Sequence, residues 1–236
     1  MSNMFNSASV FDGDISSWNV SSVTNMSSMF KGTSSFNQDI GNWDVNNVTD
    51  MSFMFYGAGD FNQDIGSWDM GKVTNIGYMF TNAGSFNQDL NSWNTEEVLT
   101  MEKVFIYAGN FNGDISNWNT SKVINMRGTF FGSNFNQDIS TKLVTRANGS
   151  TYTAWNTSSV TNMSLMFNSA SVFNGSISDW DTSSVLDMDE MFLDASAFNR
   201  DLSDWCVTNI ATEPTDFDTG SLLTTINKPV WGTCPA

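Results

Sequence analysis

Large apolar residues recur along this chain at a fixed step, and polar residues fill the positions between them. A tryptophan returns every 25 residues and, after one interruption, resumes the same step: Trp18, Trp43, Trp68, Trp93, Trp118, Trp155, Trp180 and Trp205. A fixed period of this size, carried by large apolar side chains, is typical of a solenoid whose stacked coils bury one continuous core. We therefore expect one elongated domain.

Two segments of each repeat differ in their apolar spacing. Ile15, Trp18 and Val20 have the spacing of a leucine-rich-repeat strand, on which alternate side chains point inward. Met26, Met29 and Phe30 lie at positions i, i+3 and i+4, which is one face of a short helix. We therefore predict an α/β repeat solenoid, leucine-rich-repeat-like, with one short parallel strand and one short helix per 25-residue coil. Glycines stand where a left-handed residue would end the helix, at Gly32, Gly57 and Gly132.

The tryptophan and methionine columns are predicted to form the core. Most methionines fall in the two helix columns, as Met26 and Met29 do in the second coil and Met51 and Met54 in the third. Methionine is flexible and polarizable, so it fills gaps beside an indole ring without requiring a single rotamer. We interpret both columns as packing, not as a platform for a cofactor or sugar.

The repeat pattern also sets the domain boundaries. Residues 1–212 are predicted to form about eight repeats, the first of them truncated, with an insertion near 140–154. Residues 213–236 lack the period and are expected to cap the exposed core of the last coil. Because Met4 and Phe5 stand one period before Met29 and Phe30, the chain opens within a repeat. We expect it to be a piece of a longer protein whose export signal and anchor lie outside it.

The repeated phrase carries a family resemblance. W-[DN]-[VT]-S-S-V-T-N-M-S-x-M-F-x-x-A-x-x-F-N-x-D-[IL], seen with one departure each from Trp18 to Ile40 (Thr33) and from Trp155 to Ile177 (Ser176), resembles the BspA-type leucine-rich-repeat family of microbial surface proteins. The similarity covers roughly residues 4 to 212, and the closing WCVTNI and KPVWGTCP are similar to the ends of such arrays. The resemblance implies an exported or cell-surface protein that serves in adhesion or partner binding, and it implies no catalytic residues.

Charge and composition exclude several classes of function. The chain has 25 acidic and 9 basic residues, a net charge of -16, which disfavours nucleic acid and anionic membrane surfaces as partners. No apolar run is long enough for direct membrane insertion. The sequence has no histidine, which removes the commonest general base, so we predict that the protein is not an enzyme. We expect a monomer whose partner is a protein or glycan on another surface.

Both cysteines, Cys206 and Cys234, lie in the C-terminal segment. A pair confined to the end of a solenoid is expected to pin the cap by a disulfide, which persists in oxidising, extracellular surroundings. In the chain-entropy model such a loop contributes roughly 3 to 4 kcal/mol. Two free buried thiols are the alternative.

Two polar columns are candidate sites. The first is expected to point outward from the parallel sheet and to offer a regular row of amides and carboxylates to a ligand: Asn19, Asp44, Asp69, Asn94, Asn119, Asn156 and Asp181. Hydrogen bonding from edge to edge, which would only stabilise the sheet, is the alternative.

The second column includes Asp39, Asp64, Asp89 and Asp114. Carboxylates this close repel one another by roughly 1 kcal/mol even in water, so the column needs compensation. Turn amides of the backbone are one source, and calcium, which prefers oxygen ligands, is the other. We predict no other cofactor.

The insertion is the third candidate, because loops inserted into repeats often lie on the binding face. Lys142, Arg146 and Tyr152 make it the least acidic protrusion of the chain, although a tolerated surface loop would look the same. Together these features predict a non-catalytic binding or adhesion module of an exported cell-surface protein. A structural spacer without a ligand of its own is the alternative.

Overall fold

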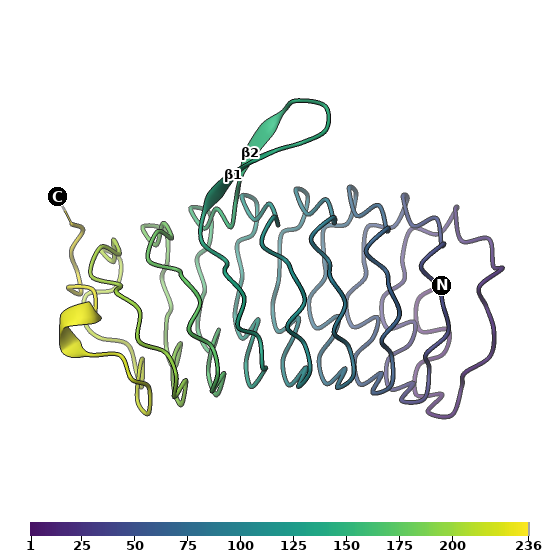
Figure 1. The fold of residues 1–236 in the computed structure, drawn as a ribbon, viewed down its shortest axis with the longest axis horizontal. Coiled ribbons are helices and arrows are strands. Elements are labelled where there is room, and N and C mark those ends of the chain that lie inside the picture. The colour runs from purple at the N-terminus through teal and green to yellow at the C-terminus, as the bar shows by residue number, and fades with distance from the viewer. Residues whose placement is uncertain (236) are drawn as a thin grey trace.

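The computed structural model describes residues 1–235, and Figure 1 shows them as a row of stacked coils with one terminus at each end. A single hairpin projects from the side of the row. Isolated parallel bridges join successive coils at Asn25, Asp50, Asn75, Thr100, Asn125, Asn162 and Asp187. Residue 236, the last of the predicted cap, lies outside the described residues.

The prediction of a strand and a helix in every coil is wrong. Residues 1–235 contain no α-helix, and their two strands, β1 (Lys142–Thr145) and β2 (Thr151–Ala154), form one antiparallel pair within the insertion. One 3-10 helix, η1 (Thr225–Asn227), lies near the C-terminus. The chain is therefore a solenoid of turns and not an α/β leucine-rich-repeat solenoid. Over the same residues, no helix is long and apolar enough to cross a membrane.

Consecutive turns replace the predicted helix at Met26–Thr33, because every second amide points along the stack. Four N–H groups donate to carbonyls of the next coil over 2.6 to 2.9 Å: Met26 to Asp50, Ser28 to Ser52, Phe30 to Met54, and Gly32 to Tyr56. Of the amides between them, Met29 and Lys31 donate to the carbonyl three residues back, at 3.1 and 3.3 Å, and Ser27 donates to the side-chain oxygen of Asn25 at 2.9 Å. A helix would use all of these groups internally, so the bonds between coils exclude it.

Left-handed residues make the chain of turns possible. Ser28 and Gly32 have φ of 56° and 67°, and Phe53 and Gly57 repeat them with 59° and 66° in the next coil. The glycines do adopt the predicted left-handed conformation, although no helix precedes them. At Phe53 the same conformation costs of order 1 kcal/mol or more, which the packing around it must offset.

The predicted strand at Ile15–Val20 is likewise a pair of turns. In the next coil the N–H of Trp43 donates to the Ile40 carbonyl at 3.1 Å, and the N–H of Val48 donates to the Val45 carbonyl at 2.9 Å. These turns prevent an extended ladder while still directing Ile40, Trp43, Val45 and Val48 into the core.

The prediction of a tryptophan and methionine core is confirmed, with exceptions in the first coil. From Met26 onward the methionines of both columns are at most 1% exposed, and Trp43 and the later tryptophans of the column are at most 4% exposed. Phenylalanines stack alongside them: the ring centroids of Phe30 and Phe36 are 4.0 Å apart, and Phe30 lies 5.7 Å from Phe55 in the next coil. Each ring is covered by the coils on both sides.

The insertion leaves the stack and returns to it without breaking it. β1 and β2 pair from Lys142 with Ala154 to Thr145 with Thr151, and they form the projecting hairpin of Figure 1. Trp155 follows directly, donating its N–H to the Trp118 carbonyl at 2.9 Å. The rings of Trp118 and Trp155 stack with centroids 6.4 Å apart, so the core is continuous beneath the hairpin.

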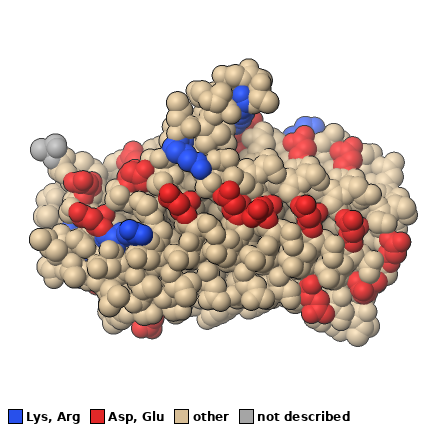
Figure 2. Space-filling model, in the orientation of Figure 1, with Lys and Arg blue, Asp and Glu red and all other residues tan. Residues whose placement is uncertain are grey.

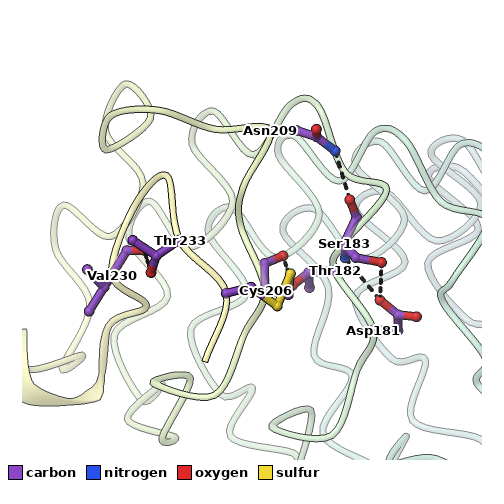
Figure 3. The surroundings of a disulfide bond; sticks show 8 residues. Asp181, Thr182, Ser183, Cys206, Asn209, Val230 and Thr233 are labelled. Atoms are coloured by element: carbon purple, nitrogen blue, oxygen red, sulfur yellow. Dashed lines mark hydrogen bonds between the residues drawn. A yellow bond between two sulfur atoms is a disulfide. The ribbon is translucent and has the colours of Figure 1, made fainter. Parts of the chain in front are cut away.

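The C-terminal segment lies against the last coil. A disulfide joins Cys206 to Cys234, and Figure 3 shows it beside Thr182, whose hydroxyl donates to the Cys206 carbonyl at 2.8 Å. Phe217 is buried and packs edge-on against Phe192 and Trp231. Lys228 forms ion pairs of 2.7 Å with Glu213 and Asp218. Although partial burial acts to lower the pKa of Lys228, hydrogen bonds with these two carboxylates raise it.

Candidate functional site

Members of the two predicted polar columns line one shallow groove on the side of the stack. The groove has a volume of about 550 Å³ and is bordered by Asp64 and Asp89 of one column and by Asp69 and Asn94 of the other, with Trp68 among its lining residues. Because the segment is made of turns, the expected regular ribbon on a parallel sheet is absent from this face. The structure brings the two columns together instead.

A second hollow continues the groove toward the hairpin. It has a volume of about 270 Å³ and is lined by Asn94 and Asn119 of the first column and by Arg146 and Tyr152 of the insertion. The two hollows share Asn94 and Ser92, so they form one continuous surface. We call this surface, from Asp64 to Tyr152, the polar groove.

Turns hold both columns in place. In the first column the side-chain oxygen of each residue accepts the N–H two residues later, as Asp69 does from Gly71 at 3.0 Å and Asn119 from Ser121 at 3.2 Å. In the second, Asp64 accepts from Gly66 at 2.9 Å. Asn19, Asp44, Asn156 and Asp181 make the same turn but line neither hollow of the polar groove.

Backbone amides therefore compensate the second column. Asp39 accepts the N–H of Gly41 at 3.0 Å, and Asp114 accepts that of Ser116 at 2.8 Å, while Asp89 accepts the N–H of Asp114 in the next coil at 2.8 Å. Among residues 1–235 no group of three or more acidic, cysteine or histidine side chains is placed to hold a metal ion. The geometry thus supplies the backbone compensation predicted for these carboxylates.

Asp14 and Asp201 occupy the repeat position of the second column in the first and last coils, and hydrogen bonds favour their ionised forms. The hydroxyl and N–H of Ser16 hold the pKa of Asp14 below its usual value. At the other end, the N–H and hydroxyl of Ser203 lower the pKa of Asp201 in the same way. Figure 2 shows a line of acidic side chains along this face of the molecule, with basic side chains on and beside the hairpin.

The hairpin is anchored to the coils that precede it by contacts that all three predicted residues make. Lys142 donates to the Ser116 hydroxyl at 2.8 Å, and the Tyr152 hydroxyl donates to the Asn117 carbonyl at 2.6 Å. Arg146 forms an ion pair with Glu96 at 2.5 Å and lies over the Tyr152 ring at 4.5 Å from its centroid. The hairpin therefore covers one end of the polar groove.

A ladder of asparagines next to the groove was missed by the sequence analysis. The side-chain oxygen of Asn62 accepts the N–H of Asn87 in the next coil at 2.9 Å, and Asn37 accepts that of Asn62 at the same distance. Gln88 adds a bond from its amide to the Asn62 carbonyl, also at 2.9 Å. The signal was present, since an asparagine follows the phenylalanine of almost every coil. Glu96 was missed as well, because its arginine partner lies 50 residues away.

One comparison with known proteins gives a match. A family described as "Mycoplasma protein of unknown function, DUF285" matches residues 1–93, 80–149 and 142–229. No curated protein and no solved structure matches the chain.

Proposed function

We propose that this chain, which belongs to the DUF285 family of Mycoplasma proteins of unknown function, is a non-catalytic binding module of an exported surface protein. Its polar groove would receive a protein or glycan carried by another surface. The observation that carries the proposal is the position of the hairpin, which lies over Asn94 and Asn119 and closes one end of the groove.

The lining chemistry supports a hydroxyl-rich or amide-rich ligand. Asn94, Asn119 and Ser92 present amide and hydroxyl groups, which both donate and accept hydrogen bonds. Tyr152 adds an aromatic ring at the closed end. The open end is acidic, with Asp64, Asp69 and Asp89, and disfavours phosphate or sulfate groups. A neutral glycan or a peptide segment without acidic residues fits both ends.

Two further features support a surface role without catalysis. The Cys206–Cys234 disulfide is typical of oxidising, extracellular surroundings. The absence of histidine from the sequence leaves the groove with carboxylates, amides, hydroxyls and the Arg146 guanidinium, and the carboxylates recur from coil to coil where a catalytic pair would occur once. Calcium held between carboxylates and ligand oxygens is the one cofactor we include, as a component of the bound complex.

A glycan and matrix-protein array, probed with and without calcium, tests the proposal. Two variants then locate the site. Deleting residues 141–153 leaves Ser140 and Ala154 between Ile139 and Trp155, which is the spacing of Ile115 and Trp118, so the core should still stack. Charging the groove with Asn94→Lys and Asn119→Lys should abolish the binding that the array detects.

Leu99→Lys with Ile124→Lys is the matched control. It adds the same two charges to the same two coils, at side chains that are 45% and 52% exposed and do not line the groove. We expect this control to bind normally. If the array detects no ligand, the chain is a structural spacer. If a ligand is detected and all variants bind it alike, the polar groove is not its binding site.

A further inference from the structure

The outer face of the first coil differs from every other coil face of the chain. Trp18 is 37% exposed, whereas its counterpart one coil later, Trp43, is 4% exposed. Met4 is 48% exposed where Met29 is fully buried. Phe5 and Phe11 are only partly buried, although the equivalent Phe30 and Phe36 are completely buried. This face is an apolar cross-section of the core, and no other coil formed by residues 1–235 covers it.

Backbone groups on this face also lack the partners that later coils have. In the second coil the carbonyls of Ser27, Met29 and Lys31 accept N–H groups of the first coil over 2.6 to 3.0 Å. Their counterparts one repeat earlier are Ser2, Met4 and Asn6, and within residues 1–235 no hydrogen bond reaches those three carbonyls. The Trp18 indole N–H likewise has no acceptor in that range, whereas Trp43 donates to the Ile15 carbonyl at 3.2 Å.

The three carbonyls and the indole N–H without hydrogen-bond partners, together with the exposed rings, define the chemistry of a partner. It must donate three N–H groups at alternate residues, offer one carbonyl to the Trp18 indole, and place two aromatic rings over Phe5 and Phe11. The interface between two successive coils supplies these donors, this acceptor and these rings. On the inner side of the first coil, for example, the ring centroid of Phe30 lies 5.6 Å from that of Phe5, and the ring centroid of Phe36 lies 5.9 Å from that of Phe11. We propose that the outer face of the first coil is a docking surface for one further coil of the same 25-residue repeat, running in the same direction.

Polarity excludes a second copy of this chain as the occupant. Two first-coil faces brought together would present three backbone carbonyls each, those of Ser2, Met4 and Asn6, and no backbone N–H groups in register with them; the Trp18 indole N–H is one donor against three acceptors. At the opposite end the matching donors are already used, because Glu190, Phe192 and Asp194 donate to carbonyls of Thr215, Phe217 and Thr219 over 2.7 to 2.8 Å. Within residues 1–235 the C-terminal segment thus occupies these donors, and they are not available to a first-coil face.

The test is the full chain with a copy of residues 26–50 fused directly before Met1. Met1 stands one period before Met26, so the copy enters in register, and the N–H groups copied from Ser28, Phe30 and Gly32 face the carbonyls of Ser2, Met4 and Asn6. We expect a higher melting temperature with a single transition. We also expect the Trp18 fluorescence, isolated by subtracting the Trp18→Phe variant, to shift to shorter wavelength and to resist quenching by iodide.

Amide hydrogen exchange of the copy gives the second readout, and exchange at its three donor amides should slow by about tenfold or more. The control carries the same copy with serine at the residues copied from Phe30, Phe36 and Ile40, and it should show none of these changes. The proposal is overturned if the intact copy and the serine control behave alike. A dimer of the unextended chain in which Trp18 is protected would also overturn it, because the occupant would then be a second copy.

Discussion

The indole N–H of Trp93 donates to the carbonyl oxygen of Ile65 in the preceding coil over 2.9 Å. The same oxygen also accepts the N–H of Trp68, in its own coil, at 3.1 Å. One carbonyl thus closes a turn and holds the next coil, and the same arrangement recurs with Trp68 and Ile40 one coil earlier. The tryptophan column is therefore both packing and hydrogen-bonded linkage.

Substitution of Trp93 by phenylalanine should destabilise the fold. Trp93→Phe removes the bond to Ile65 and part of a ring that stacks on Trp118 at 6.0 Å, which together cost about 1 to 3 kcal/mol. Trp18→Phe is the control, because Trp18 is partly exposed and its cost should stay below about 1 kcal/mol. Urea unfolding followed by circular dichroism measures both. Equal losses would show that the hydrogen bond is unimportant.

The asparagine ladder should contribute to stability although its side chains are exposed. Asn62→Ala leaves the N–H of Asn87 without its partner and should cost about 1 kcal/mol in the free energy of unfolding. Asn42→Ala changes an exposed asparagine for which no side-chain hydrogen bond occurs within residues 1–235, and it should cost less than about 0.5 kcal/mol. Thermal unfolding of the two variants measures the difference. Equal melting temperatures would contradict a contribution of the asparagine ladder to stability.

Tyr78 should titrate late. Partial burial, together with a hydrogen bond of 2.9 Å from its hydroxyl to Glu102, raises the pKa of Tyr78 to about 12 from its ordinary value of 10.0. The folded state therefore holds this proton more tightly than the unfolded chain. Its contribution to stability is complete below pH 10.0 and is lost as the pH rises toward about 12.

The Tyr78→Phe variant checks this pH dependence. Its unfolding free energy should decline less steeply than that of the parent over the same alkaline range, and the ultraviolet titration should lose the tyrosine that ionises at about pH 12. The interpretation fails if the parent and the variant give superimposable titration curves.

Removal of the disulfide should loosen the C-terminal segment. Cys206 and Cys234 are 28 residues apart, and in the chain-entropy model the crosslink contributes roughly 3 to 4 kcal/mol. Cys206→Ala with Cys234→Ala should lower the melting temperature and speed amide exchange in the last coil, at Phe192 for example. A reductant should lower the melting point of the parent and leave that of the double variant unchanged.

The core was predictable from the sequence because a period of 25 residues places every large apolar side chain once per coil. Secondary structure was not, since Met26, Met29 and Phe30 have a spacing that suits a helix and a chain of turns equally. Hydrogen bonds between coils, such as that from the N–H of Phe30 to the Met54 carbonyl, select the turns over the helix. The sequence of a single repeat does not reveal these bonds. Phe53 shows the same limit, because few sequence signals place a phenylalanine at positive φ.

The polar groove was predictable in its members and not in its shape. Both columns and the insertion stood out in the sequence, and Asp64, Asn94 and Tyr152 do line one surface. Their meeting depends on the turns at Asp64 and Asp69 and on the direction in which the hairpin leans. Arg146 helps to anchor the hairpin through its ion pair with Glu96, a contact across 50 residues that local patterning cannot supply.

The hairpin between Ile139 and Trp155 has one consequence for how such proteins vary. Both of its stems meet the scaffold at a single corner, and the indole of Trp155 takes its place in the column as though the intervening residues were missing. The corner therefore acts as a grafting position. Segments of differing length and chemistry can be exchanged there, because the packing between coils continues to stabilise the fold.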